Sequence, residues 1–147
     1  MNKKYSTIIK EGVTTPNGRL YKKGSLDKIK EFLQPYIDKN CCFTVLGADR
    51  DAFCMYNGYG VRELYTDKAV GLYSGLVKSF NINEGRGELE VDSIPTSAGH
   101  SFESMQEFGI DFSVDFDIAG IINESDSSVT IKDISPVVVL RRNESKN

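Results

Sequence analysis

One stretch of nine residues constrains the fold of this chain more than any other feature of its sequence. From Ile110 to Ile118, apolar residues alternate strictly with polar ones, and three of the four polar residues are aspartates. Alternation with a period of two is typical of a β-strand that buries one face and exposes the other. The pattern therefore predicts a strand over residues 110–118, in a sheet with one solvated side.

Shorter strand patterns surround this segment. The run from Val137 to Leu140 is apolar at every position, as expected for a strand that is buried on both faces. Residues 123–128 are rich in Asn, Ser and Asp, and they predict a hairpin turn before the last strands. The predicted strands cover 5–11, 41–46, 70–73 continuing at 76–82, 87–92, 110–118, 129–132 and 136–140.

Two further segments show the spacing of helices. Ser25 is a suitable N-cap, and the apolar residues after it recur on one helical face until Pro35, which predicts a helix over 25–34. Ser101 is suitable as a second cap, and the apolar residues after it predict a short helix over 101–108. Two helices among so many strands indicate an α+β fold.

The chain of 147 residues is long enough to bury a core without disulfides or metals. Its residues are 39% hydrophobic and 27% charged, which is typical of a globular protein rather than a disordered one. We therefore expect a single domain over 1–147. Its α+β fold would contain a mostly antiparallel six- or seven-stranded sheet or barrel with two helices.

The net charge of −3 conceals an uneven distribution. Residues 1–86 carry a net charge of +5, residues 87–133 one of −10, and residues 134–147 one of +2. The acidic middle block would repel phosphate groups, so we expect no nucleic-acid partner, but it would attract a protein with a basic surface. No apolar run approaches the ~20 residues of a membrane-spanning helix, so we expect no membrane partner.

The cysteines and the histidine limit metal and disulfide chemistry. Cys41, Cys42 and Cys54 form an odd set, and the first two are adjacent and poorly placed to bridge each other. Such a set favours reduced thiols over a disulfide scaffold. His100 is the only histidine, which excludes a histidine-rich metal site. We expect the chain to bind no metal and no cofactor.

Two groups of residues are candidates for binding a partner. The aspartates of the alternating strand share one face, which is either a simple solvated surface or a docking surface for a basic protein. The segment MYNGYG is an aromatic loop that either packs on the sheet or contacts a partner, since tyrosine binds at low entropic cost. The candidate binding residues are Asp111, Asp115, Asp117, Tyr56 and Tyr59.

Four segments occur in an order that resembles a known family. They are residues 17–21 (NGRLY) before the helix at 25–34, residues 87–91 (GELEV) before the helix at 101–108, the strand at 110–118, and the closing strands around 129–136. This order is similar to that of the prohead (capsid-maturation) proteases of tailed bacteriophages, which are related in fold to the herpesvirus assemblin proteases. The resemblance implies a prohead-protease-like fold.

The catalytic positions of that family are replaced here. The family's Gly-Glu-Leu-Asp-His-Pro type motif is matched best by residues 62–67, which puts Thr66 at the place of the histidine. In the strand that resembles the nucleophile segment, Asp115 and Phe116 stand at two serine positions and Asp117 at a basic one. Because a serine protease needs both a nucleophile and a base, the resemblance implies a scaffold without the reaction.

These features favour a non-catalytic, prohead-protease-like structural protein of a phage head. It would be an auxiliary or decorating capsid protein or a capsid assembly factor, found in the virion or in the host cytoplasm during assembly. Its partners would be the major capsid protein or other head proteins, in a symmetric multi-copy assembly. Two alternatives stay open: an active serine-type maturation protease that uses Ser113 and His100, and a host-directed protein-binding module.

Overall fold

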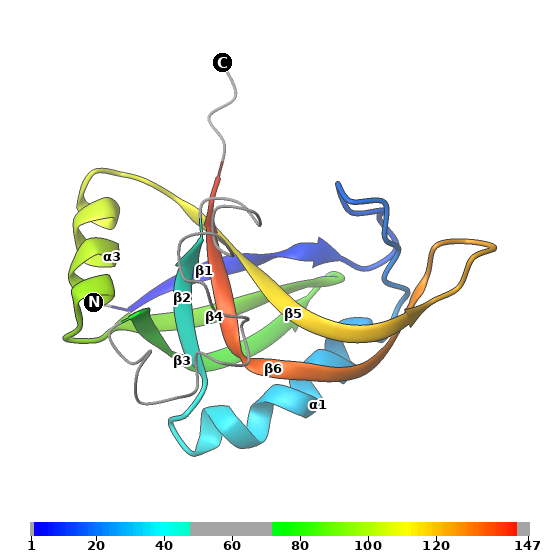
Figure 1. Ribbon diagram of the computed structural model, residues 1–147, viewed down its shortest axis with the longest axis horizontal. Helices are drawn as coiled ribbons and strands as arrows, with labels where there is room; N and C mark the ends of the chain where they lie inside the picture. Colours follow the sequence, from blue (N-terminus) through cyan, green and yellow to red (C-terminus); the bar gives the residue numbers. More distant parts are fainter. Residues whose placement is uncertain (1, 48–71, 144–147) are drawn as a thin grey trace.

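The computed structural model describes residues 2–47 and 72–143. In these residues, six strands close into a β-barrel (Figure 1). The strands are β1 (Asn2–Lys10), β2 (Phe43–Gly47), β3 (Tyr73–Asn83), β4 (Arg86–Ser93), β5 (Phe112–Ile122) and β6 (Val129–Arg142). The helices are α1 (Ser25–Asp38) and α3 (Ser97–Glu107). The order around the barrel is β1-β4-β3-β2-β6-β5. The predicted α+β fold is confirmed in the described residues.

Most neighbouring strands run antiparallel, as predicted, but two pairs are parallel. β2 pairs with β6 in parallel along its whole length, from Phe43 to Gly47. β1 and β5 meet in parallel at a single pair, Thr7 opposite Val114. β6 is therefore held from both sides, whereas the junction between β1 and β5 is narrow.

The alternating strand predicted from the sequence lines the barrel core. In β5, Phe112, Val114 and Phe116 are buried, and the residues between them are half-buried on the outer face. The ring of Phe116 stacks on that of Phe80 from β3, with the ring centroids 5.9 Å apart. Helix α1 packs against β3 and β6, and α3 mainly against β3 and β4 (Figure 1). Neither helix of the described part is long and apolar enough to span a membrane.

Helix α1 begins with a cap that differs from the predicted one. Gly24, not Ser25, is the N-cap, and it adopts the left-handed conformation with φ of 93°. The carboxylate of Glu11, just after β1, accepts hydrogen bonds of 2.9 Å from the backbone N–H groups of Gly24 and Leu26. This carboxylate satisfies free N–H groups of the first turn, so the helix does not need a serine cap.

Helix α1 also continues past Pro35, where the sequence predicted its end, and runs to Asp38. The proline lacks the N–H that would bond to the carbonyl group of Glu31, and both residues are exposed at the surface of the helix. Ile37 is buried in the core, and its packing holds the last turn in the helix.

Helix α3 begins one turn before the predicted start. Its N-cap is Thr96, whose hydroxyl accepts the N–H of Gly99 at 2.9 Å, and Ser101 lies inside the helix instead of capping it. A Cβ at Gly99 would stand 1.7 Å from the carbonyl oxygen of Ile94. The helix gains this extra first turn because only glycine at position 99 lets it fold against the preceding chain.

The last two predicted strands, 129–132 and 136–140, form the single strand β6. The register of β5 against β6 shifts twice, and the extra residues lie in β6 both times. Pro136 falls in one of these irregular stretches, between the partners of Phe116 and Ile118. A missing N–H is tolerated at such a bulge, so the proline does not divide the strand.

β3 joins two predicted pieces in the same way. It runs unbroken through Gly75, while residues 70 and 71 of the first predicted piece lie outside the described part. A Cβ at Gly75 would stand 2.7 Å from the carbonyl oxygen of Asp92. The glycine thus allows β4 to approach β3 closely.

Replacing Glu11 with alanine is expected to lower the free energy of unfolding by about 1–2 kcal/mol, because two N–H groups at the start of α1 lose their acceptor. Urea denaturation followed by circular dichroism measures this change. Glu31→Ala, on an exposed position of α1, is the matched control and is expected within about 0.5 kcal/mol of the unchanged chain. Equal effects of the two substitutions would contradict the cap.

Candidate functional site

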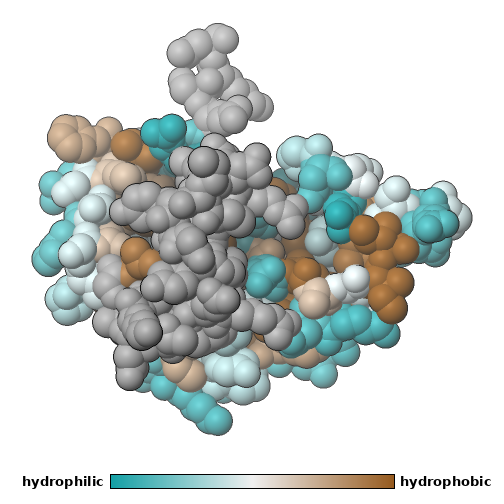
Figure 2. All heavy atoms as spheres, in the orientation of Figure 1, coloured by the Kyte–Doolittle hydropathy of each residue, from teal (hydrophilic) through white to brown (hydrophobic). Residues whose placement is uncertain are grey.

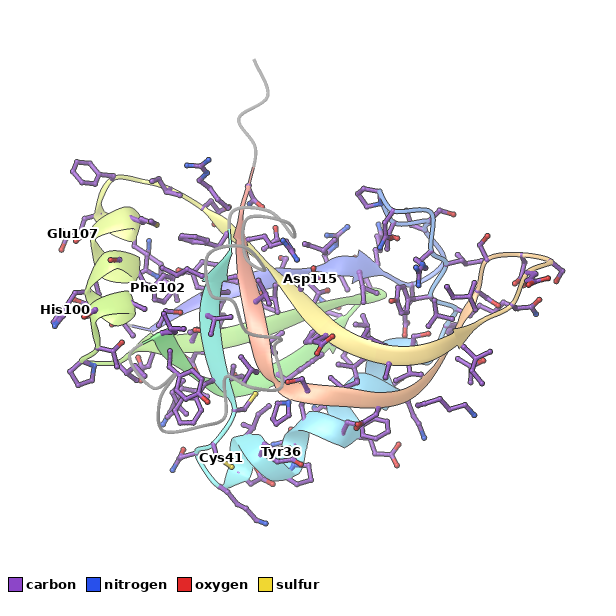
Figure 3. All side chains as sticks on the ribbon, in the orientation of Figure 1. Tyr36, Cys41, His100, Phe102, Glu107 and Asp115 are labelled. Carbon is purple, nitrogen blue, oxygen red and sulfur yellow. The ribbon has the colours of Figure 1, made fainter. Side chains whose placement is uncertain are left out.

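The three aspartates selected from the sequence have different environments. β5 begins at Phe112, so Asp111 precedes the strand and is exposed. Asp115 and Asp117 are half-buried on the outer face of β5, where Figure 3 labels Asp115. The three side chains therefore differ in what they offer to a partner.

The negative charge of Asp115 is compensated by a basic residue of the same chain. Its Oδ2 accepts a hydrogen bond from Nε of Arg141 at 2.7 Å, and its Oδ1 accepts the backbone N–H of Phe116 at 2.9 Å. The side chains of Asp115 and Arg141 are 32% and 18% exposed, so water screens this ion pair only in part. Both carboxylate oxygens of Asp115 are hydrogen-bonded within the chain, so this charge serves the fold more than it serves an external partner.

Asp111 and Ser113 meet at Asn143, the residue after β6. The side-chain amide of Asn143 donates to Oδ2 of Asp111 at 3.1 Å, and its backbone N–H donates to the carbonyl oxygen of Asp111 at 2.9 Å. The hydroxyl of Ser113 donates to the amide oxygen of Asn143. Neither Asn143 nor Arg141 was selected from the sequence, because their place opposite this strand depends on the register of β6.

Asp117 differs from the other two aspartates. Among the residues that the structure describes, its carboxylate has no ion pair and no hydrogen bond, and it is half-buried on the outer face of β5. In the same residues, no group of three Asp, Glu, His or Cys side chains is placed to hold a metal ion. Asp117 is thus the predicted binding residue whose charge is most available to a partner.

His100 and Ser113 are not joined by a hydrogen bond in the described part of the chain. His100 is exposed in the first half of α3, on the outer side of the helix (Figure 3). Ser113 lies on β5, and its hydroxyl is bonded to Asn143. A nucleophilic serine needs a base within hydrogen-bond reach, and the partner of this serine is an amide.

One of the two positions matched to family serines, that of Phe116, lies in the core. Phe116 is 7% exposed and stacks on Phe80 inside the barrel. Thr66, at the position matched to the family histidine, lies outside the described residues, as do Tyr56 and Tyr59. Predictions on these three residues therefore remain predictions.

The described cysteines are free thiols. Cys41 is half-buried and Cys42 is buried, while Cys54 lies outside the described residues. Burial, and to a smaller extent the neighbouring Cys41, raises the pKa of Cys42 to about 12. Cys42 is therefore a protonated core thiol at neutral pH, not a nucleophile.

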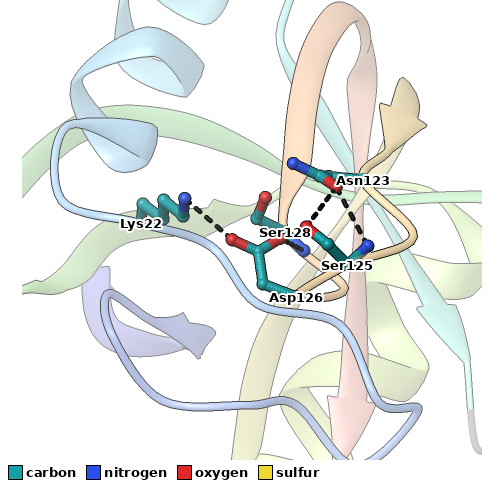
Figure 4. Close-up of polar contacts among 5 residues, drawn as sticks. All are labelled: Lys22, Asn123, Ser125, Asp126 and Ser128. Carbon is teal, nitrogen blue, oxygen red and sulfur yellow. Dashed lines mark hydrogen bonds and ion pairs between the residues drawn. The ribbon is translucent and has the colours of Figure 1, made fainter.

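The outer end of the β5–β6 hairpin holds a second acidic group (Figure 4). Asp126 accepts the N–H of Ser128 at 3.0 Å, and Nζ of Lys22 lies 2.9 Å from its Oδ2. The hydrogen bonds from Ser128 and the ammonium of Lys22 hold the pKa of Asp126 well below its usual range. Oδ1 of Asn123 accepts the N–H and the hydroxyl of Ser125. The hydrogen bonds of Asn123 and Ser128 hold the turn itself, and Lys22 joins it to the segment before α1.

In the described residues, the closed six-stranded barrel with its two helices defines a prohead-protease-like fold. The solved structure of the bacteriophage T4 capsid assembly protease, gp21, matches with a TM-score of 0.67 and 12% sequence identity, covering 94% of this chain and 80% of that chain. No protein-family profile and no curated protein matches the sequence. The fold implied by the resemblance is confirmed, and at this identity the likeness concerns the fold alone.

A double-mutant cycle on Asp115 and Arg141 is expected to give a coupling energy of about 1 kcal/mol, because this ion pair is close and partly enclosed. The unfolding free energies of Asp115→Ala, Arg141→Ala and the double variant measure it. The control cycle uses Lys4 and Glu88, which are 4.0 Å apart and much more exposed. We expect no measurable coupling there, and equal values for the two pairs would contradict the assigned role of Asp115.

Proposed function

We propose that the chain is a non-catalytic, prohead-protease-like structural protein of a phage head, either an auxiliary or decorating capsid protein or a capsid assembly factor. The observation that carries this proposal is the chemistry of β5 where it resembles the family's nucleophile segment. Phe116 packs in the core and offers no nucleophile. Asp115 is engaged by Arg141 and by a backbone N–H.

Ser113 is the hydroxyl that remains on the outer face of this strand. It donates to the amide oxygen of Asn143, and an amide does not take up a proton at neutral pH. Thr66, at the position matched to the family histidine, is no base either. The absence of a nucleophile and of a base at the matched positions supports a retained scaffold with another use.

A place in head assembly is supported by the fold, because the similar solved structure is a capsid assembly protease. We propose as partners the major capsid protein or other head proteins, in a symmetric multi-copy assembly where many weak contacts add up. The chain would act in the virion or in the host cytoplasm during assembly. The proposed contact residues are Asp111, Asp115, Asp117, Tyr56 and Tyr59.

Binding of the purified chain to heads of the phage that encodes it tests the acidic contact. Changing the three aspartates at 111, 115 and 117 to asparagine is expected to weaken binding about tenfold at ~0.1 M salt, because their attraction to a basic surface is lost. The control removes three exposed carboxylates elsewhere: Glu31→Gln, Glu84→Gln and Glu107→Gln. If both triple variants bind equally well, the acidic contact is wrong.

A fluorophosphonate probe, which labels activated serines, separates this proposal from an active protease. We expect no labelling at Ser113, because no described side chain activates its hydroxyl. Labelling that disappears in both Ser113→Ala and His100→Ala would establish the serine-type maturation protease instead. The chain's absence from both proheads and mature heads would favour the host-directed binding module.

A further inference from the structure

β5 has an open edge over its second half. It pairs with β6 on one side as far as Ile122, but in the described residues it pairs with β1 on the other side only at Val114. The N–H of Phe116, the next group on that side, donates to Asp115 and not to a neighbouring strand. In the described part of the chain, the side of β5 that faces away from β6 is thus unpaired from Phe116 to Ile122.

Every second residue of β5 presents its backbone groups at this edge. Asp111 and Asn123, next to the two ends of β5, both form backbone hydrogen bonds toward the β6 side. The extra residues at the register shifts lie in β6, so the alternation along β5 is unbroken between these ends. The N–H and C=O groups of Ile118, Gly120 and Ile122 therefore point away from β6.

The residues in the outer part of this edge are exposed. Ala119 and Gly120 are exposed, and Ile121 and Ile122 are 59% and 39% exposed. Figure 2 shows hydrophobic side chains gathered near the outer end of the β5–β6 hairpin, at the right of the view. Proteins usually protect such edges with proline or charged side chains, and residues 118–122 contain neither.

The charges around the edge indicate the kind of chain that would pair with it. Residues 111–133 contain six carboxylates and one lysine. Lys22 and Arg141 compensate two of these carboxylates, so an excess of negative charge remains. A strand that alternates lysine or arginine with apolar residues matches both the carboxylates and the exposed isoleucines.

We propose that the open edge of β5, residues 116–122, docks an extended basic segment of a head protein, which adds to the β5–β6 hairpin as a further strand. The backbone groups of Ile118, Gly120 and Ile122 bond to the incoming segment, and the surrounding carboxylates select for its lysine or arginine side chains. This inference rests on the proposed function, because the partner is a protein of the phage head.

Amide hydrogen exchange, followed by NMR on the full chain, tests the edge with an eight-residue peptide of alternating lysine and valine. At a peptide concentration about ten times Kd, the N–H groups of Gly120 and Ile122 are expected to exchange about tenfold more slowly. The N–H of Ile121, which faces β6, is expected to be unchanged. A glutamate–valine peptide and a lysine–valine peptide that is N-methylated at alternate bonds are expected to have no effect.

Ile122→Lys adds a cation to the edge and is expected to abolish the slowing, whereas Phe108→Lys, at an 85% exposed position after α3, is expected to retain it. Unchanged exchange at Gly120 and Ile122, or equal slowing by the N-methylated peptide, would overturn the inference. Slowing that rises with the concentration of the chain alone would make a second copy the occupant and would also overturn it. The peptide experiment contains no phage particle. If the peptide has no effect but the chain still binds phage heads, the inference about the edge fails and the proposed function stands.

Discussion

The barrel depends on the pairing of β6, which is hydrogen-bonded to β2 on one side and to β5 on the other. Val138 and Leu140, which are fully buried, are paired with residues of both neighbouring strands inside the core. β2 reaches only as far as Val137, so the earlier part of β6 leaves the barrel with β5 as a two-stranded hairpin. One strand therefore determines both the closed core and the open hairpin edge.

The periodicity of the sequence predicted the two faces of β5, because side chains alternate along any strand. It did not predict what lies beside Asp115. A regular hairpin from the turn at 123–128 would place Val138 opposite Ser113, but the extra residues in β6 place Arg141 there instead. Bulges of this kind depend on how the whole barrel closes, and no local pattern reveals them.

Local signals also failed where a distant residue took over their role. Ser25 is a good cap in sequence, yet the carboxylate of Glu11 binds the N–H groups of Gly24 and Leu26 at the helix start from the end of β1. Pro35 is tolerated because the turn that contains it is anchored by Ile37. The order of motifs predicted the fold better than these single residues did, since the barrel is shared with a protease at 12% identity. Identity this low leaves the residues of the site to be judged by their own chemistry.

Quantitative mass spectrometry of purified proheads and mature heads is the most direct measurement of a structural role in the phage head. If the chain is an auxiliary capsid protein or an assembly factor, it will be present in proheads, in mature heads or in both, in many copies per particle. Its absence from both particles would contradict this role.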